Sequence, residues 1–204
     1  KTAREFDWLA FLKLDNGDPD GAIAHATRAI GLDPEYLPAW TTRARARAEK
    51  GDLEGAISDD TRAIELDSGD AIAWLHRGTM WLKTGDLEEA IADCGRAIRL
   101  DPNSVEAWIC RGTARGKKND LEGAIEDFSR AIILDPRSVE AWTRRGNARK
   151  ARGDLDGAIE DYTRAIDLSP GRPEPVWQRG KGKAEGSLEL AEVKKNRDRK
   201  GRSR

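Results

Sequence analysis

The sequence predicts an all-α protein built as an array of repeated helix hairpins. One observation is that tryptophan recurs every 34 residues, and two alanines of each unit keep the same step: Trp40, Trp74, Trp108, Trp142; Ala56, Ala90, Ala124, Ala158; Ala63, Ala97, Ala131, Ala165. A second is that proline closes four units at the same step: Pro34, Pro102, Pro136, Pro170. A third is that helix-capping residues recur with this period. A fixed period of 34 residues indicates units that bury their apolar faces by packing on their neighbours.

Each unit is expected to hold two antiparallel helices, A and B. The five units are predicted at about residues 3–36, 37–70, 71–104, 105–138 and 139–172. In the fourth unit, helix A is predicted to run from about Val105 to Lys118, with Ser104 as its N-cap. Each helix A ends at a residue that tolerates left-handed backbone: Gly17, Gly51, Gly85, Asn119, Gly153. The next residue is expected to cap helix B: Asp18, Asp52, Asp86, Asp120, Asp154.

The order of Trp, Gly or Ala four residues later, Ala-Ile, Arg-Ala-Ile and Leu-Asp-Pro resembles the tetratricopeptide repeat over about residues 3–170. This resemblance implies a right-handed α–α superhelix of about five helix-turn-helix repeats plus a C-terminal capping helix. It also implies a concave groove, lined by the helices A, in which a peptide or short helix of a partner lies. Residues 173–193 are expected to form a degenerate sixth helix, and residues 194–204 a disordered basic tail.

Comparison of the units reveals a coupled pair of charged places. Helix A carries arginine and helix B carries aspartate in four units: Arg43, Arg77, Arg111, Arg145 with Asp59, Asp93, Asp127, Asp161. The first unit has Leu9 and His25 there, so it lacks both partners together. We therefore expect a partly buried Arg–Asp bond between helices, either within a unit or to the next. Helix A carries a second recurring arginine, at Arg47, Arg115 and Arg149, where the third unit has Trp81. The pattern does not explain this second arginine.

The candidate binding residues point away from the Trp–Gly face of each helix A. They are Trp8, Phe11, Thr41, Arg45, Ile72, Leu75, His76, Thr79, Leu82, Ile109, Thr113, Thr143, Arg144 and Asn147. An apolar strip centred on Ile72, Leu75, Leu82 and Ile109 is expected to bind the partner, because the stack does not need these side chains. The alternative is a solvated face with incidental aliphatic residues.

The first helix is apolar almost all round, in the stretch FDWLAFLKL. A helix of this kind is normally covered. Two explanations stay open: residues upstream in a longer protein cover it, or it is a surface for self-association. Because the chain begins at Lys1 without Met, we interpret it as a fragment or a processed product.

Composition limits the classes of function. The chain has 204 residues, 36% of them charged, and a net charge of −1, with the basic excess confined to the tail. The absence of any run of 18 apolar residues predicts no membrane-spanning helix. Cys94 and Cys110 are expected to be buried free thiols, which favours a reducing, cytoplasmic location. The two histidines, His25 and His76, have no partners at catalytic or metal-ligand spacing, so we expect no enzyme activity, cofactor or metal.

One variety of the resembled family grips the C-terminal carboxylate of cytosolic chaperones with a Lys-Asn-Asn-Lys-Arg clamp. The matching places read Asp7, Phe11, Thr42, Ile72, His76 from the first unit and Leu75, Thr79, Cys110, Glu140, Arg144 from the third. Only the final arginine is present. We therefore predict that no chaperone-tail clamp of this type exists here.

The sequence favours a non-enzymatic protein–protein interaction scaffold that binds a peptide or helix in the groove. One alternative is weak, salt-dependent nucleic-acid association through the basic tail. Another is a regulatory or substrate-recruiting segment of a larger enzyme. Self-association through the first repeat is a further possible partner interaction.

Overall fold

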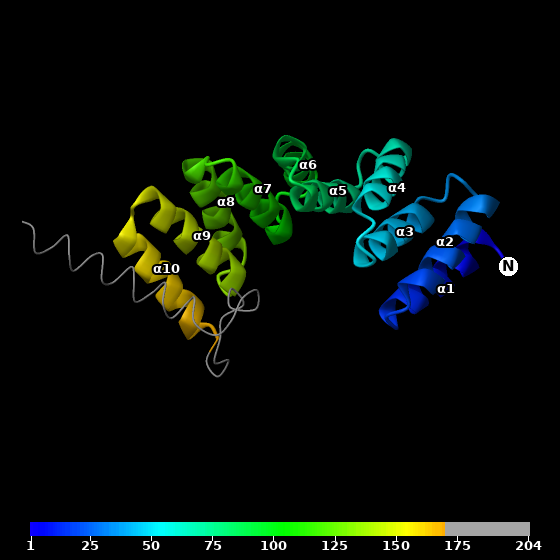
Figure 1. Ribbon diagram of the computed structural model, residues 1–204, viewed down its shortest axis with the longest axis horizontal. Helices are drawn as coiled ribbons and strands as arrows, with labels where there is room; N and C mark the ends of the chain where they lie inside the picture. The colour runs from blue at the N-terminus through cyan, green and yellow to red at the C-terminus, as the bar shows by residue number, and fades with distance from the viewer. Residues whose placement is uncertain (170–204) are drawn as a thin grey trace, which may run out of the picture. The chain divides into compact units, whose positions relative to one another are not determined.

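The computed structural model describes residues 1–169, which form ten α-helices and no strand (Figure 1). The helices are α1 (Ala3–Asp15), α2 (Pro19–Leu32), α3 (Leu37–Glu49), α4 (Leu53–Leu66), α5 (Ala71–Thr84), α6 (Leu87–Leu100), α7 (Val105–Lys117), α8 (Leu121–Leu134), α9 (Val139–Arg152) and α10 (Leu155–Asp167). Odd-numbered helices are the helices A and even-numbered ones the helices B. The predicted segments 173–193 and 194–204 lie outside the described residues.

The helix ends follow the predicted capping pattern. Most helices B begin at an aspartate whose carboxylate accepts a hydrogen bond from the backbone N–H three residues later, as Asp18 does from Gly21 at 2.8 Å. The exception is Asp86, which makes no such bond; its carboxylate accepts a bond of 2.6 Å from the Thr84 hydroxyl. Asn119 is the one non-glycine of the described residues with positive φ, at 66°. The local signals therefore set where each hairpin turns.

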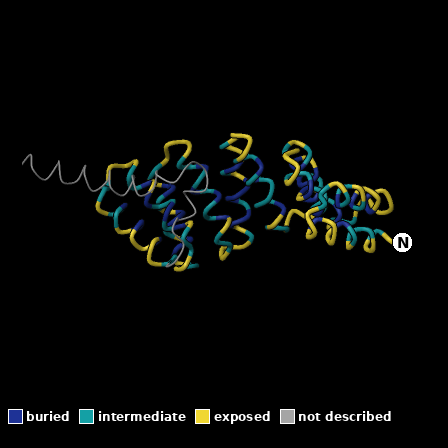
Figure 2. The backbone as a smooth tube through the Cα atoms, turned by 60° about the horizontal axis from the view of Figure 1, so that its bottom comes forward, coloured by how far each residue is buried: buried dark blue, intermediate teal, exposed yellow. Residues whose placement is uncertain are grey.

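The chain divides into two compact units. Unit 1 spans Lys1–Pro102 and contains α1 to α6; unit 2 begins at Asn103 and contains α7 to α10. Within each unit every helix packs on the next one along the chain, and α1 also lies against α3. Exposed residues concentrate at the turns and outer sides of the helices, with buried residues between them (Figure 2). The predicted all-α repeat fold is confirmed.

The core is a series of small clusters, each shared by a helix B and the following helix A. In unit 1, Ala63 and Ile64 of α4 pack with Ala73 of α5. In unit 2, Ala131 and Ile132 of α8 pack with Ala141 of α9 in the same way. The periodic tryptophans contact these clusters but are only half-buried. The indole N–H at three of them donates to a loop carbonyl: Trp40 to Pro34 at 2.9 Å, Trp74 to Ser68 at 3.0 Å, Trp142 to Pro136 at 3.0 Å.

The predicted Arg–Asp bond is present in all four units that carry the pair, and it joins helices A and B of the same unit. In each case the arginine Nε and Nη2 donate to the two carboxylate oxygens, at 2.7 to 3.0 Å. The aspartates are 1% to 5% exposed. Each guanidinium also lies over the tryptophan three residues earlier, 4.8 to 4.9 Å from the ring centroid. The unit thus holds an indole, a guanidinium and a carboxylate in one cluster, called here the Trp–Arg–Asp cluster.

Two further contacts complete the Trp–Arg–Asp cluster. The arginine Nη1 reaches a hydroxyl on the preceding helix B in three units: Arg43 to Thr27 at 3.2 Å, Arg77 to Thr61 at 3.0 Å, Arg145 to Ser129 at 3.0 Å. A second arginine of helix A pairs with the same carboxylate: Arg47 with Asp59 at 2.9 Å, Arg115 with Asp127 at 3.0 Å, Arg149 with Asp161 at 3.1 Å. The second arginine place is thereby explained: it supplies a second cation to a buried anion.

The third repeat differs at this second place. Trp81 stands there and packs with the apolar cluster of Ala56, Ile57 and Met80. Its aspartate, Asp93, accepts the two bonds of Arg77. This repeat therefore replaces an ionic contact by apolar burial.

The cysteine prediction is wrong in one respect. Cys94 and Cys110 are buried, as expected, but neither is a free thiol, since both are disulfide-bonded. The argument from free thiols to a reducing compartment therefore fails. No helix among the described residues is long and apolar enough to cross a membrane.

Replacing Asp127 by alanine should destabilise the protein by about 3–5 kcal/mol, because the guanidinium groups of Arg111 and Arg115 lose their shared buried anion. The double change Arg111→Leu with Asp127→Ala should lose less, since it removes one of the stranded cations. Urea unfolding followed by circular dichroism measures both losses. Equal losses in the single and double variants would contradict a buried ionic role.

Glycine in the middle of helix A permits close helix contact. A Cβ added at Gly146 would lie 2.7 Å from Cε1 of Tyr162, whose ring is buried. Gly146→Ala should therefore cost about 1–3 kcal/mol by overpacking. The control is Gly116→Ala, where the new Cβ meets Ala124 at an ordinary 3.7 Å. That change should be neutral or gain up to about 1 kcal/mol, because alanine favours helix. Thermal unfolding of both variants tests this contrast.

Candidate peptide-binding face

The helices A carry all of the predicted binding residues, and the side of each helix A that carries them is called here its A-helix face, taken for each unit by itself. In α1, Trp8 is 61% exposed and Phe11 40% exposed, although both are large apolar side chains. Their rings stack with centroids 5.8 Å apart and an interplanar angle of 20°. An exposed stacked aromatic pair is unusual on a surface that nothing contacts. The pair is therefore the first element of a candidate site.

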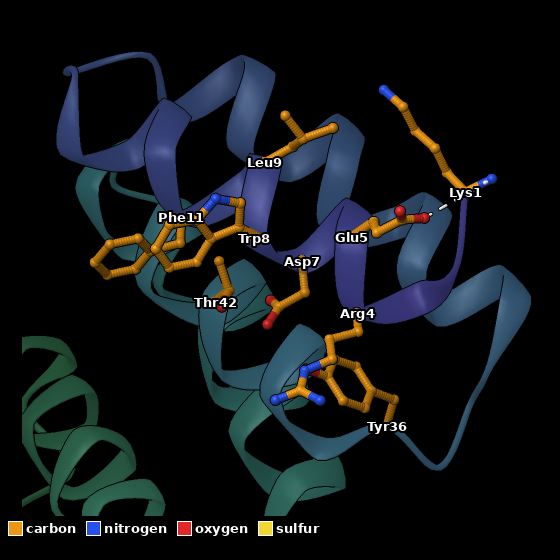
Figure 3. A pocket seen from close by; sticks show the side chains of 9 residues that line it. All are labelled: Lys1, Arg4, Glu5, Asp7, Trp8, Leu9, Phe11, Tyr36 and Thr42. Carbon is orange, nitrogen blue, oxygen red and sulfur yellow. Dashed lines mark ion pairs between the residues drawn. The ribbon is translucent and has the colours of Figure 1, made fainter.

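A cavity of about 630 Å³ lies beside this aromatic pair (Figure 3). Its wall comes from α1, from Tyr36 just before α3, and from Thr42 within α3. The volume falls in the range of natural ligand pockets, about 300–1,000 Å³. The predicted residues Trp8 and Phe11 are thus brought together at a hollow in unit 1.

Asp7 places a carboxylate in the wall of this cavity (Figure 3). Its Oδ1 is buried and has no hydrogen-bond partner. Burial raises the pKa of Asp7, and the nearby hydroxyls of Thr42 and Tyr36 oppose the rise by hydrogen bonding. Burial also raises the pKa of the Tyr36 phenol, and the charge of Asp7 adds to that rise. Asp7 was not among the candidate residues, although it is the one charged residue between the aromatics of FDWLAF.

A smaller cavity of about 260 Å³ also has Phe11 in its lining, together with Arg45 and Glu49 of α3. Arg45 is exposed, so its guanidinium is accessible to a ligand. The predicted Thr41 is half-buried instead, and its hydroxyl donates to the Pro38 carbonyl at 3.0 Å. Of the two predicted α3 residues, Arg45 is therefore the one placed for contact.

In α5 the predicted residues differ in exposure. Ile72 is 74% exposed, whereas Leu75, Thr79 and Leu82 are half-buried. His76 is also half-buried, and its Nδ1 lies 2.6 Å from Oδ2 of Asp60 in α4. None of these five residues lines the cavities described above or below. Ile72 is the accessible member of the predicted strip in unit 1.

Asp60 is a buried acid that was not predicted as a site residue. Its side chain is 1% exposed and its Oδ1 has no hydrogen-bond partner. Burial raises the pKa of Asp60, while the bond from His76 acts in the opposite direction. The repeat pattern contained a signal for this burial. Asp60 occupies the same place in its unit as Cys94, Phe128 and Tyr162 in the later units, so this acid stands in a core position.

In unit 2, a cavity of about 300 Å³ has Thr113, Arg144 and Asn147 in its lining, all three predicted. The other two predicted residues turn inward. Thr143 is 6% exposed and donates to the Val139 carbonyl, and Ile109 packs against the clusters around Phe128 and Ile132. Ile109 therefore contributes to the core of unit 2, not only to its surface.

No group of three or more His, Cys, Asp or Glu side chains among residues 1–169 is arranged to hold a metal ion. The chemistry offered by the A-helix face consists of aromatic rings, aliphatic side chains, the carboxylate of Asp7 and the guanidinium of Arg45.

A family model described as tetratricopeptide repeat matches residues 9–71 and 111–173, and a second one matches residues 71–104. The chain belongs to the tetratricopeptide repeat family. Tetratricopeptide repeats in general mediate protein interaction and are not catalytic, so the chain is a protein-interaction scaffold in this general sense.

Solved structures show the same tetratricopeptide repeat fold. A crystal structure of MamA has 23% identity and a TM-score of 0.74, and covers 79% of this chain and 94% of its own. MamA 41-end from Desulfovibrio magneticus RS-1 has 20% identity, a TM-score of 0.77, and coverage of 82% and 94%. YrrB, a tetratricopeptide repeat protein with an unusual peptide-binding site, has 21% identity, a TM-score of 0.70, and coverage of 82% and 86%. No curated protein gives a significant match.

The buried Asp60 should make stability depend on pH. Because its folded-state pKa is raised above the ordinary 3.8, its contribution to stability is full below that value and is lost as pH rises through the raised value. The free energy of unfolding of the wild type, relative to Asp60→Asn, should therefore fall as pH increases across this window. Urea titrations at several pH values measure the difference. Repeating the pair in a His76→Gln background removes the imidazole, and a difference that rises with pH there would contradict the assignment.

Proposed function

We propose that this protein is a non-enzymatic scaffold that binds a peptide or a helix of a partner protein along the A-helix face. The observation that supports this best is the exposure of large apolar side chains on helices A. Trp8, Phe11 and Ile72 are 61%, 40% and 74% exposed, and none of them is among the buried core residues. Apolar side chains left free beside cavities are typical of binding surfaces.

The helices B present a different surface. Their exposed large apolar residues are Leu32, Ile133 and Ile166. Each lies alone near the C-terminal end of a different helix, α2, α8 and α10 respectively. Apolar residues scattered singly are ordinary on any soluble surface. The peptide-binding site reported for YrrB, a protein of the same fold, supports the same use of the fold here.

The proposal excludes a chaperone-type carboxylate clamp. Arg144 is the only clamp residue that the sequence retains, and its Nε donates to Glu140 at 2.7 Å in unit 2. An acidic neighbour lowers the attraction of this arginine for a terminal carboxylate. Self-association through the first repeat would use the same aromatic pair as a peptide does. The nucleic-acid alternative rests on the basic tail, which lies outside the described residues.

Ile72→Glu should reduce capture of partner proteins at least about tenfold, because it places a charge at the most exposed apolar position of helices A. Ile133→Glu is the matched control, since Ile133 is an isoleucine of similar exposure, 67%, on a helix B. Both variants and the wild type serve as bait in a quantitative pull-down read by mass spectrometry. Loss of the same proteins from both variants, or from neither, would contradict binding at the A-helix face.

A further inference from the structure

One side of α1 carries a stripe of four residues spaced by four, three and four positions: Arg4, Trp8, Phe11 and Asp15. Residues at these spacings lie on one face of a helix. All four residues are exposed, and the two in the middle are the stacked aromatic pair. This stripe, called here the α1 stripe, thus has a cation near one end, two rings at its centre and an anion at the other end.

The charges at the two ends of the α1 stripe are not used within the chain. Arg4 and Asp15 form no ion pair with any of residues 1–169. Glu49 of α3 lines a cavity together with Asp15 and is also without an ion pair among these residues. Arg45 is the one cation of the described residues in that lining, so the C-terminal end of the stripe has an acidic excess.

The α1 stripe is complementary to itself about a two-fold axis. Residues 4 and 15 have the same midpoint as residues 8 and 11, between Leu9 and Ala10. Two copies of α1 laid antiparallel about this midpoint therefore place Arg4 opposite Asp15 and Trp8 opposite Phe11, each pairing twice. One register satisfies the charges and the rings together. An unrelated peptide would not require opposite charges at equal distances from the centre of the stripe, whereas a second copy does.

The cavity of about 630 Å³ beside the aromatic pair supplies a hollow next to the projecting rings (Figure 3). Its lining holds two cations and two acids, so their formal charges cancel: Lys1, Arg4, Glu5 and Asp7. An uncharged ring enters such a hollow at a lower desolvation cost than a charged group does. A ring of a second copy inserted there would bury aromatic surface of both copies.

We infer that the α1 stripe is a homodimer interface, in which two α1 helices pair antiparallel about a two-fold axis. Arg4 of each copy pairs with Asp15 of the other, and the rings of Trp8 and Phe11 pack on those of the second copy. At the places of the two rings, α3, α5, α7 and α9 hold no Phe, Tyr or Trp, so this contact is specific to the first repeat. The inference goes beyond the proposed function, because its occupant is a second copy of the chain.

Sedimentation velocity of the full chain over a range of concentrations measures the dimer. The wild type should dimerise with a Kd of about 10–100 µM, because one pair of three-turn helices buries less area than the about 1,200 Å² of a stable interface. Trp8→Ala should weaken the dimer at least about tenfold, since it removes the largest ring at the centre of the contact. Circular dichroism and thermal melting of each variant serve as the folding control.

Charge reversal tests the antiparallel register. Arg4→Glu and Asp15→Arg each place like charges opposite one another, so each should weaken the dimer about three- to tenfold. The double variant Arg4→Glu with Asp15→Arg restores opposite charges in this register and should recover most of the lost affinity. Lys13→Glu is the matched control, because it makes the same charge change as Arg4→Glu on an exposed residue of α1 outside the stripe. It should leave the Kd unchanged.

Several outcomes would overturn the inference. A wild type that stays monomeric up to about ten times the expected Kd excludes the interface, since about four fifths of the chains should then be dimeric. A dimer that Trp8→Ala leaves unchanged forms through another surface. A double variant no tighter than the single variants excludes the antiparallel register. Weakening by Lys13→Glu equal to that by Arg4→Glu would reduce the effect to net charge.

The outcome also separates this inference from the proposed function. If the wild type stays monomeric but Ile72→Glu loses partners that Ile133→Glu keeps, the dimer assignment fails and the proposed function stands. If the dimer responds to the charge changes as expected but neither isoleucine change affects capture, the α1 stripe is a self-association surface and the proposed function fails.

Discussion

The buried aspartate of helix B is the constraint on which the rest of each later repeat depends. An anion that is 1% to 5% exposed is stable only if cations and hydrogen-bond donors surround it. Helix A provides them by placing an arginine opposite, between the carboxylate and the tryptophan ring. This requirement fixes the rotation of helix A relative to helix B and positions the indole over the guanidinium. It also determines which side of helix A is left outside, and thus where a ligand has access.

Much of the fold was predictable from the sequence because the structural requirements repeat in four or five units. The joint loss of both charged partners in the first unit, at Leu9 and His25, identified the Arg–Asp bond without coordinates. The role of the second arginine was not predictable. Arg115 lies one turn after Arg111 on α7 and pairs with Asp127 of α8. The spacing of residues along one helix does not reveal a partner on another helix. The disulfide-bonded state of the cysteines was likewise missed, since burial alone does not distinguish a thiol from a bonded sulfur.

The candidate site was only partly accessible to sequence reasoning. A helical wheel gives the direction in which each residue leaves the helix axis, but it does not show whether a neighbouring helix covers that side chain. Trp8, Phe11 and Ile72 are exposed where the wheel places them outward. Thr143 points the same way but is buried, and Ile109 is half-buried against the core. Asp7 and Asp60 were missed because an acid at a helix surface is ordinarily solvated. Their unpartnered oxygens become visible only when the surrounding side chains are placed.

The spacing of the Trp–Arg–Asp cluster has a consequence for how such a chain grows. Each of Arg43, Arg77 and Arg145 bonds a hydroxyl 16 residues before it and a carboxylate 16 residues after it. The hydroxyl, the arginine and the carboxylate therefore lie within a stretch of the chain that is shorter than one period. A tandem duplication or excision of one whole period at the DNA level reconstitutes the complete set at the new junction. An insertion or deletion between these partners that is not a whole number of periods changes their spacing, so the chemistry itself favours lineages that vary in whole repeats.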